Sequence, residues 1–159
     1  MKTAVVFYSL DGNCNFVAEE VKSLLNADLI RLQTQDDKKR RGFFKMVWGG
    51  SMVFGRKKPP LKPYTFDPAA YDLIVIGAPV WAGSPAPPIR TFLSDTGISG
   101  KKTALFVCHG GGKGKALDTL KALLAGNEII AQADFVNARK NGGEVKRQIV
   151  DWVKGFEGK

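Results

Sequence analysis

The chain has 159 residues, of which 44% are hydrophobic and 25% are charged, and this length and composition fit one globular domain with a buried core. Two cysteines and one histidine exclude a disulfide framework and disfavour a conventional zinc site, and the formal net charge of +9 favours anionic or acidic partners. The N-terminal apolar run is too short for a signal peptide, and no later run approaches the roughly 18 apolar residues of a membrane span. We therefore expect a single cytoplasmic domain over residues 1–159.

Five short runs rich in β-branched and aromatic residues predict β-strands. They cover residues 3–8, 28–33, 72–78, 103–109 and 128–136. The segments AVVF, LIVI and ALFV are continuous rather than alternating, which is typical of strands buried on both faces of a parallel sheet. Residues 28–33 alternate apolar and polar side chains, which favours a strand at the edge of that sheet.

Apolar residues at a period of 3.6 predict an amphipathic helix after strands 1, 3, 4 and 5. The apolar faces contain Val17, Val21, Leu24 and Leu25; Ile89, Phe92, Leu93 and Thr96; Leu117, Leu120 and Leu124; and Val145, Ile149, Trp152, Val153 and Phe156. This alternation, with right-handed crossovers, predicts an α/β fold in which a doubly wound, five-stranded parallel sheet, in the order 2-1-3-4-5, lies between two layers of helices. In such a sheet a ligand binds at the carboxyl ends of the strands, here between strands 1 and 3.

Residues 35–64 form a basic insert that interrupts this alternation. They hold nine basic and two acidic residues, a local charge of +7 within the total of +9. The apolar segment GFFKMVWGGSMVFG inside the insert predicts a short helix or a packed turn. Local packing is the favoured interpretation of Trp48 in this segment, and stacking on the ring of a ligand is the alternative. A long insert in a compact domain is more often functional than not, and a solvated surface is the alternative interpretation.

Three loops of unusual composition follow strands 1, 3 and 4 and would meet at the carboxyl edge of the sheet. Residues 9–14 (SLDGNC) offer a hydroxyl, a glycine and an asparagine at the start of a helix, as phosphate binding requires. Residues 79–88 hold a tryptophan in a rigid path beside prolines, and residues 109–115 are rich in glycine, which permits close approach of a ligand. Together these loops suit a planar, phosphorylated heteroaromatic ligand.

The candidate binding residues all come from these three loops. They are Ser9, Leu10, Asp11, Gly12, Asn13 and Cys14 in the first; Pro79, Val80, Trp81, Ala82, Gly83 and Ser84 in the second; and His109, Gly110, Gly111 and Gly112 in the third. Less specific interpretations stay open: residues 9–14 as a simple turn, Trp81 as a core residue, and His109 as a strand-end residue. Cys14 is either an inert thiol or one with a lowered pKa at the helix N-terminus. No catalytic or metal-binding residue is predicted.

Other nucleotide-binding and hydrolase motifs do not fit the chain. GGGKGK lacks the spacing of a P-loop, no GxGxxG follows strand 1, and GGSMV lacks the last glycine of GxSxG. Strand 3 ends in Gly-Ala-Pro, without the acceptor aspartate of a phospho-receiver domain.

The chain resembles the flavodoxin-like FMN-binding family over nearly its whole length outside the basic insert. Residues 9–14 are similar to the family's phosphate-binding pattern, Ser/Thr-x-Thr-Gly-x-Thr. Residues 77–93 (GAPVWAGSPAPPIRTFL) are similar to the flavin-facing loop and following helix of a subgroup of small flavodoxin-like proteins. The resemblance implies FMN as the cofactor, with its phosphate on residues 9–14 and its ring beside Trp81 and residues 109–112.

Two residues depart from the family's phosphate pattern. Asp11 and Cys14 both stand where the pattern has threonine, so a carboxylate would lie near the phosphate and a weaker donor would replace a hydroxyl. Backbone N–H groups, Ser9 and Asn13 remain to hold the phosphate, and Asp11 has the alternative of bracing its own turn.

The resemblance implies electron transfer through the flavin, with transient docking of a redox partner protein. An NAD(P)H-dependent quinone or FMN reductase, an enzyme that would use a small electron acceptor, is the first alternative, because a basic rim would attract NADPH or an acidic partner. A flavin-free module that binds an anion or nucleic acid through the basic insert is the second. Nucleic acid is disfavoured because the sequence lacks the interleaved aromatic platform of single-strand binders.

Overall fold

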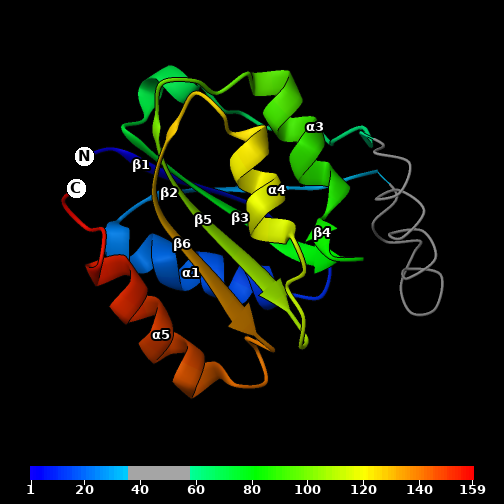
Figure 1. Cartoon of the computed structure of the whole chain (residues 1–159). Coiled ribbons are helices and arrows are strands. Elements are labelled where there is room, and N and C mark those ends of the chain that lie inside the picture. The colour runs from blue at the N-terminus through cyan, green and yellow to red at the C-terminus, as the bar shows by residue number, and fades with distance from the viewer. Residues whose placement is uncertain (36–57) are drawn as a thin grey trace.

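The computed structural model describes residues 1–35 and 58–159 of the chain. Within these residues, five parallel strands form one sheet (Figure 1). In spatial order they are β2 (Asp28–Leu32), β1 (Thr3–Tyr8), β3 (Leu73–Trp81), β5 (Lys102–His109) and β6 (Glu128–Val136). Numbered among the parallel strands alone, this is the predicted order 2-1-3-4-5, so the doubly wound fold is confirmed. The short helix or packed turn predicted over the apolar segment of the insert lies outside the described residues, as does Trp48.

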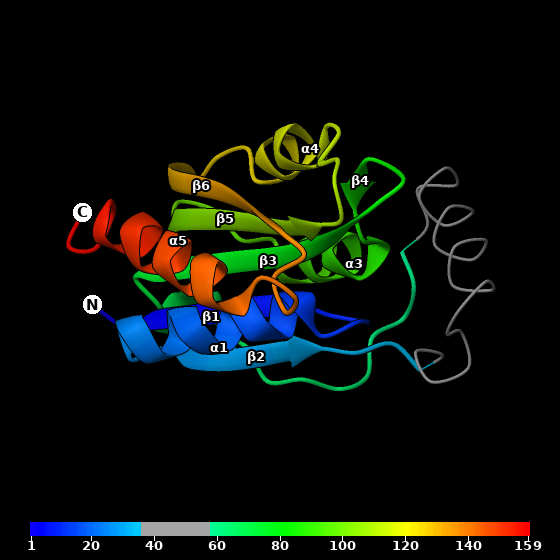
Figure 2. The same cartoon turned by 90° about the horizontal axis from the view of Figure 1, so that it is seen from below.

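Helices cover both faces of the sheet (Figures 1 and 2). One face carries α1 (Asn13–Leu25) and α5 (Gly142–Lys154), and the other carries α3 (Pro87–Thr96) and α4 (Ala116–Leu123). A short 3-10 helix, η2 (Pro68–Ala70), precedes β3. In the part of the chain that the structure describes, no helix is long and apolar enough to cross a membrane.

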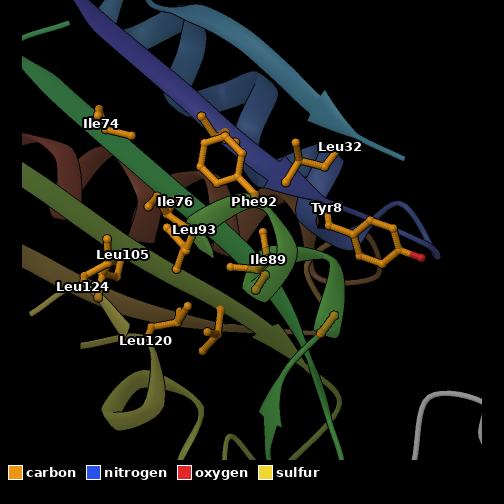
Figure 3. Packing of buried hydrophobic residues seen from close by; sticks show 14 of the residues in the cluster. Tyr8, Leu32, Ile74, Ile76, Ile89, Phe92, Leu93, Leu105, Leu120 and Leu124 are labelled. Carbon is orange, nitrogen blue, oxygen red and sulfur yellow. The ribbon is translucent and has the colours of Figure 1, made fainter. Parts of the chain in front are cut away.

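Side chains of the central strands alternate between two cores. In β1, Val6 and Tyr8 face the core under α3 and α4, whereas Val5 and Phe7 face the core under α1 and α5. Figure 3 shows the first of these cores. It joins strand residues to residues of α3, of α4 and of the position directly after α4: Tyr8, Leu32, Ile74, Ile76 and Leu105 to Ile89, Phe92, Leu93, Leu120 and Leu124. Burial on both faces explains why these strands have continuous apolar sequences.

The sequence-based boundary of the third strand is wrong at its carboxyl end. β3 continues through Pro79, Val80 and Trp81, which were predicted as loop, and Trp81 pairs with Ser84 of β4 (Ser84–Pro85) in an antiparallel hairpin. Two residues with positive φ, Ala82 at 48° and Gly83 at 73°, form the hairpin turn. Such a turn usually carries Asn-Gly or Asp-Gly, so the alanine concealed it in the sequence.

The carboxyl ends of β1, β3 and β5 lie at one edge of the sheet, and both chain termini lie at the opposite end (Figure 2). The two flanks of the basic insert meet beside β2, where Lys62 N donates to the Gln33 carbonyl at 2.7 Å. The Thr91 hydroxyl of α3 donates to the Pro59 carbonyl at 2.7 Å. Residues 59–62 are therefore held by hydrogen bonds to the segment that directly follows β2 and to α3.

Gly77 of β3 lies in the centre of the sheet, paired with Phe7 on one side and with Phe106 on the other. A Cβ at Gly77 would lie 2.0 Å from Cζ of Phe106. The Phe106 ring is held there by edge contacts with Phe135 and Trp152, with ring centroids 6.3 and 6.2 Å apart. The aromatic cluster therefore requires a glycine at this position.

The substitution Gly77→Ala is expected to lower the free energy of unfolding by about 3 kcal/mol, the upper end for an overpacked core, because Phe106 has to leave its packed position. Urea denaturation measures the loss. Phe106→Leu makes room for the new methyl group, so the double variant should lose less stability than the two single losses combined. If the stability losses of the two single variants simply added in the double variant, overlap with the Phe106 ring would not be the cause of the loss in Gly77→Ala.

Candidate functional site

A cavity of about 470 Å³ opens at the carboxyl edge of the sheet, between the ends of β1, β3 and β5. Its wall consists of Ser9, Leu10, Asp11, Asn13, Cys14, Pro79, Val80, Trp81, Ala82, Cys108, His109, Gly110 and Asn137. This volume is ordinary for a site that binds a small molecule. The structure thus brings the three loops singled out in the sequence to one cavity.

Some candidate residues lie beside the cavity rather than in its wall. These are Gly12, Gly83, Ser84, Gly111 and Gly112. Conversely, Cys108 and Asn137 line the cavity without having been candidates. Cys108 is the penultimate residue of β5 and Asn137 directly follows β6, so the rule that carboxyl ends of parallel strands meet would have found both.

The β1–α1 turn (residues 9–14) leaves the first turn of α1 open toward a ligand. Gly12 occupies the N-cap position with φ of 91°, and it has no side chain with which to cap the helix. Its N–H donates to Oγ of the buried Ser9 at 3.1 Å, so the Ser9 hydroxyl hydrogen remains available to another acceptor. Uncapped N–H groups, the helix dipole and a hydroxyl donor together favour an anion.

The β3–β4 hairpin brings an aromatic wall to the same cavity. Trp81 is half-buried, and its ring meets the ring of Tyr8 edge to face, with centroids 5.6 Å apart. The hairpin turn is tied to the β5–α4 loop (residues 110–115), because the Gly83 carbonyl accepts a hydrogen bond from Lys115 N at 3.0 Å. Trp81 thus packs on the core through Tyr8 and also lines the cavity, so its position is compatible with both interpretations of its sequence.

His109 fixes the start of the β5–α4 loop. Its Nδ1 accepts a hydrogen bond from Gly111 N at 3.1 Å, so its Nε2 carries the proton and donates to Asp134 Oδ2 at 2.8 Å. Lys113 Nζ lies 3.1 Å from the other oxygen of Asp134. The hydrogen bond from His109, followed by that from Lys113, holds the pKa of Asp134 below its ordinary value, although partial burial opposes this effect.

Two thiols lie in the wall of the cavity next to each other. Cys14 and Cys108 are both free and buried. Burial raises the pKa of Cys14 well above its ordinary value, and a hydrogen bond with Cys108 adds to this effect. The structure therefore favours the inert thiol over the reactive one at Cys14.

Asp11 is exposed at the rim of the cavity, where water reaches it. Solvent and salt screen the repulsion between an exposed carboxylate and an anion far more than they would in a buried site. The acid is therefore compatible with an anion on the β1–α1 turn.

Fold and site together define a doubly wound α/β protein with a small-molecule cavity that combines an anion-binding turn with an aromatic wall. A sequence model of the family described as flavodoxin matches residues 2–155. The chain belongs to the flavodoxin family, as its motifs predicted. No curated protein sequence matches the chain significantly.

Solved structures share this architecture. A flavoprotein from Lactobacillus acidophilus NCFM in complex with FMN is 25% identical, with a TM-score of 0.73 over 92% of this chain and 97% of that one. A protein described as a flavoprotein from Bacteroides eggerthii DSM 20697 is 20% identical, with a TM-score of 0.75 over 99% of both chains. Megasphaera elsdenii flavodoxin in its two-electron reduced state is 18% identical, with a TM-score of 0.61 over 92% of this chain and 94% of that one. The last two likenesses concern the fold alone.

The substitution Asp134→Asn is expected to destabilise the protein by about 1 kcal/mol at neutral pH, a low value for charge-assisted bonds because the site is partly exposed. The pKa of Asp134 in the folded protein lies below the ordinary value of about 3.9. The stabilisation by the Asp134 carboxylate is therefore complete above about pH 4 and is lost as the pH falls through this lowered pKa. Urea denaturation between pH 3 and 7 measures the difference from wild type. Asp118→Asn is the control, because that side chain is 79% exposed; an equal effect at Asp118 would contradict the prediction.

Proposed function

We propose that this flavodoxin-family protein binds FMN in the cavity at the carboxyl edge and transfers electrons through it. The observation that carries the proposal is the joint presence, in one cavity of about 470 Å³, of an open helix N-terminus and an aromatic wall. A phosphorylated flavin requires both features at once. The family match and the FMN complex of the Lactobacillus acidophilus flavoprotein support the same cofactor.

The β1–α1 turn fits the phosphate end of FMN. The first-turn N–H groups of α1, beginning at Asn13, and the Ser9 hydroxyl supply hydrogen-bond donors for phosphate oxygens. Asp11 adds one negative charge at the exposed rim, and the basic residues of the chain outweigh it, with a formal net charge of +9. The residues present therefore fit a phosphate.

The opposite wall fits the ring of the flavin. Trp81 offers an aromatic face or edge, and Gly110 permits close approach of the backbone next to His109. When bound, FMN supplies one-electron and two-electron redox chemistry. The protein's part is to hold the ring, shield it from water on the cavity side, and leave one edge open for a partner.

The described cavity favours an electron carrier over a reductase. Both ring nitrogens of His109, the histidine in the cavity wall, are engaged in hydrogen bonds with Gly111 and Asp134. An electron carrier needs no side chain that relays protons to a substrate. The net charge of +9 suits an acidic redox partner, in contrast to the acidic character of many flavodoxins.

Titration of the purified protein with FMN and with riboflavin tests the cofactor. We expect FMN to bind at least tenfold more tightly, because riboflavin lacks the phosphate that the β1–α1 turn holds. Ser9→Ala should weaken FMN binding about tenfold, the worth of one charge-assisted hydrogen bond, and leave riboflavin binding unchanged. Ser23→Ala, on the exposed side of α1, is the control and should change neither. Equal affinities for the two flavins in the wild-type protein would refute the phosphate site.

Reoxidation of the chemically reduced, FMN-loaded protein tests the role in electron transfer. Ferricyanide, an anionic acceptor, should react more slowly as salt is added, whereas the cationic hexaammineruthenium(III) should react faster, because salt screens the positive charge of the protein. Stopped-flow absorbance measures both rates. Saturating turnover of NADPH with a quinone, above that of free FMN, would instead show a reductase.

A further inference from the structure

Two arginine side chains hold the β1–α1 turn from separate parts of the fold. Arg31 comes from the neighbouring strand β2, and its Nη2 donates to the Ser9 carbonyl at 3.2 Å. Arg139 comes from the β6–α5 connection (residues 137–141), and its Nη1 donates to the Asp11 carbonyl at 2.8 Å. Neither residue belongs to a motif that sequence analysis selects.

These bonds orient the N–H groups of the turn. In a trans peptide the C=O and N–H bonds point in opposite directions, so an arginine that holds a carbonyl also directs the N–H of the next residue away from itself. The Ser9 carbonyl shares its peptide with the N–H of Leu10, and the Asp11 carbonyl shares its peptide with the N–H of Gly12. The Gly12 N–H is accordingly directed at Ser9 Oγ, 3.1 Å away, where it occupies a lone pair of that oxygen and leaves the hydroxyl hydrogen for a ligand.

Arg139 is fixed on the turn by more than one contact. Its backbone N–H donates to Asn13 Oδ1 at 3.1 Å. Its side chain also packs on Gly12, where an added Cβ would lie 3.2 Å from both Cδ and Nη1 of the arginine. Gly12 therefore leaves room for the guanidinium as well as adopting the left-handed φ of the N-cap.

The two guanidinium groups also change the local charge. Each guanidinium group is a cation with five N–H donors, and its bond to a carbonyl oxygen uses one of them. Two positive charges thus flank a turn that carries a single carboxylate, Asp11. This surplus favours a dianion on the turn.

We propose that Arg139, together with Arg31, makes the β1–α1 turn selective for a phosphate dianion. The two arginines hold the turn in the conformation in which Gly12 N–H engages Ser9 Oγ, so that the Ser9 hydroxyl hydrogen is left for the phosphate, and they offset the charge of Asp11. The inference rests on the proposed FMN site and extends it. Both arginines are positioning residues that act through the turn, so the protein distinguishes FMN from riboflavin by charge as well as by hydrogen-bond geometry.

The test measures dissociation constants for FMN and riboflavin, by flavin fluorescence, in Arg139→Gln, Arg139→Lys and Arg31→Gln. Lys140→Gln, an exposed neighbour with the same charge, is the matched control. We expect Arg139→Gln to weaken FMN binding about tenfold and Arg31→Gln several-fold, with riboflavin binding and the control within twofold of wild type. Arg139→Lys should recover part of the FMN affinity, and added salt should weaken FMN binding less in Arg139→Gln than in wild type.

If Arg139→Gln weakened the binding of FMN and of riboflavin equally, Arg139 would merely maintain the turn. If Arg139→Gln and Lys140→Gln weakened FMN binding equally, the effect would come from the general charge of the surface. Either result overturns the proposal. Inorganic phosphate separates this inference from the proposed function. Millimolar phosphate should raise the Tm of the ligand-free wild type above that in sodium chloride of equal ionic strength, and Arg139→Gln should abolish the increase. If wild type does not bind FMN but shows this increase, the FMN site is wrong and the phosphate selectivity stands; if both are absent, both proposals fail.

Discussion

Parallel pairing of β1 with β3 is the constraint on which the rest of the molecule depends. The register places Val5 opposite Val75 and Phe7 opposite Gly77, so both strands run to the same edge of the sheet. The turn after β1 and the hairpin after β3 then lie on either side of one cavity. Side chains on both faces of these strands are buried. If one strand shifted by one residue relative to the other, each of its side chains would move to the opposite core. The position of the site is therefore secured by the packing of the whole sheet.

The loops of the site are fastened to one another as well as to the sheet. Lys115 N binds the Gly83 carbonyl, which joins the loop after β5 to the hairpin. His109 joins that same loop to β6 through Asp134, and Arg139 joins the connection after β6 to the turn after β1. Contacts of this kind place the donors before a ligand arrives, which reduces the entropy lost on binding. The inferred phosphate selectivity of the turn follows from this prior placement.

Charge acts at two scales in this protein. The net charge of +9, much of it in residues 35–64, would govern the long-range attraction of the proposed redox partner, and salt would weaken that attraction. At the cavity a few defined groups matter instead: the guanidinium groups of Arg31 and Arg139 at the turn, and the carboxylate of Asp134 beneath His109. A partner would be affected by the net charge, and a bound flavin by the charged groups near the cavity.

The sequence by itself determined the strand order and the face of each helix, because continuous runs such as AVVF and helical stripes such as Val145, Ile149 and Val153 reflect burial directly. It also indicated the three loops, because glycine, proline and serine have local conformational preferences. The hairpin after β3 escaped it, since Ala82 adopts its positive φ only under tertiary constraint. Arg139 escaped it as well, because its contact with Asn13, 126 positions away in the chain, exists only once the sheet has assembled.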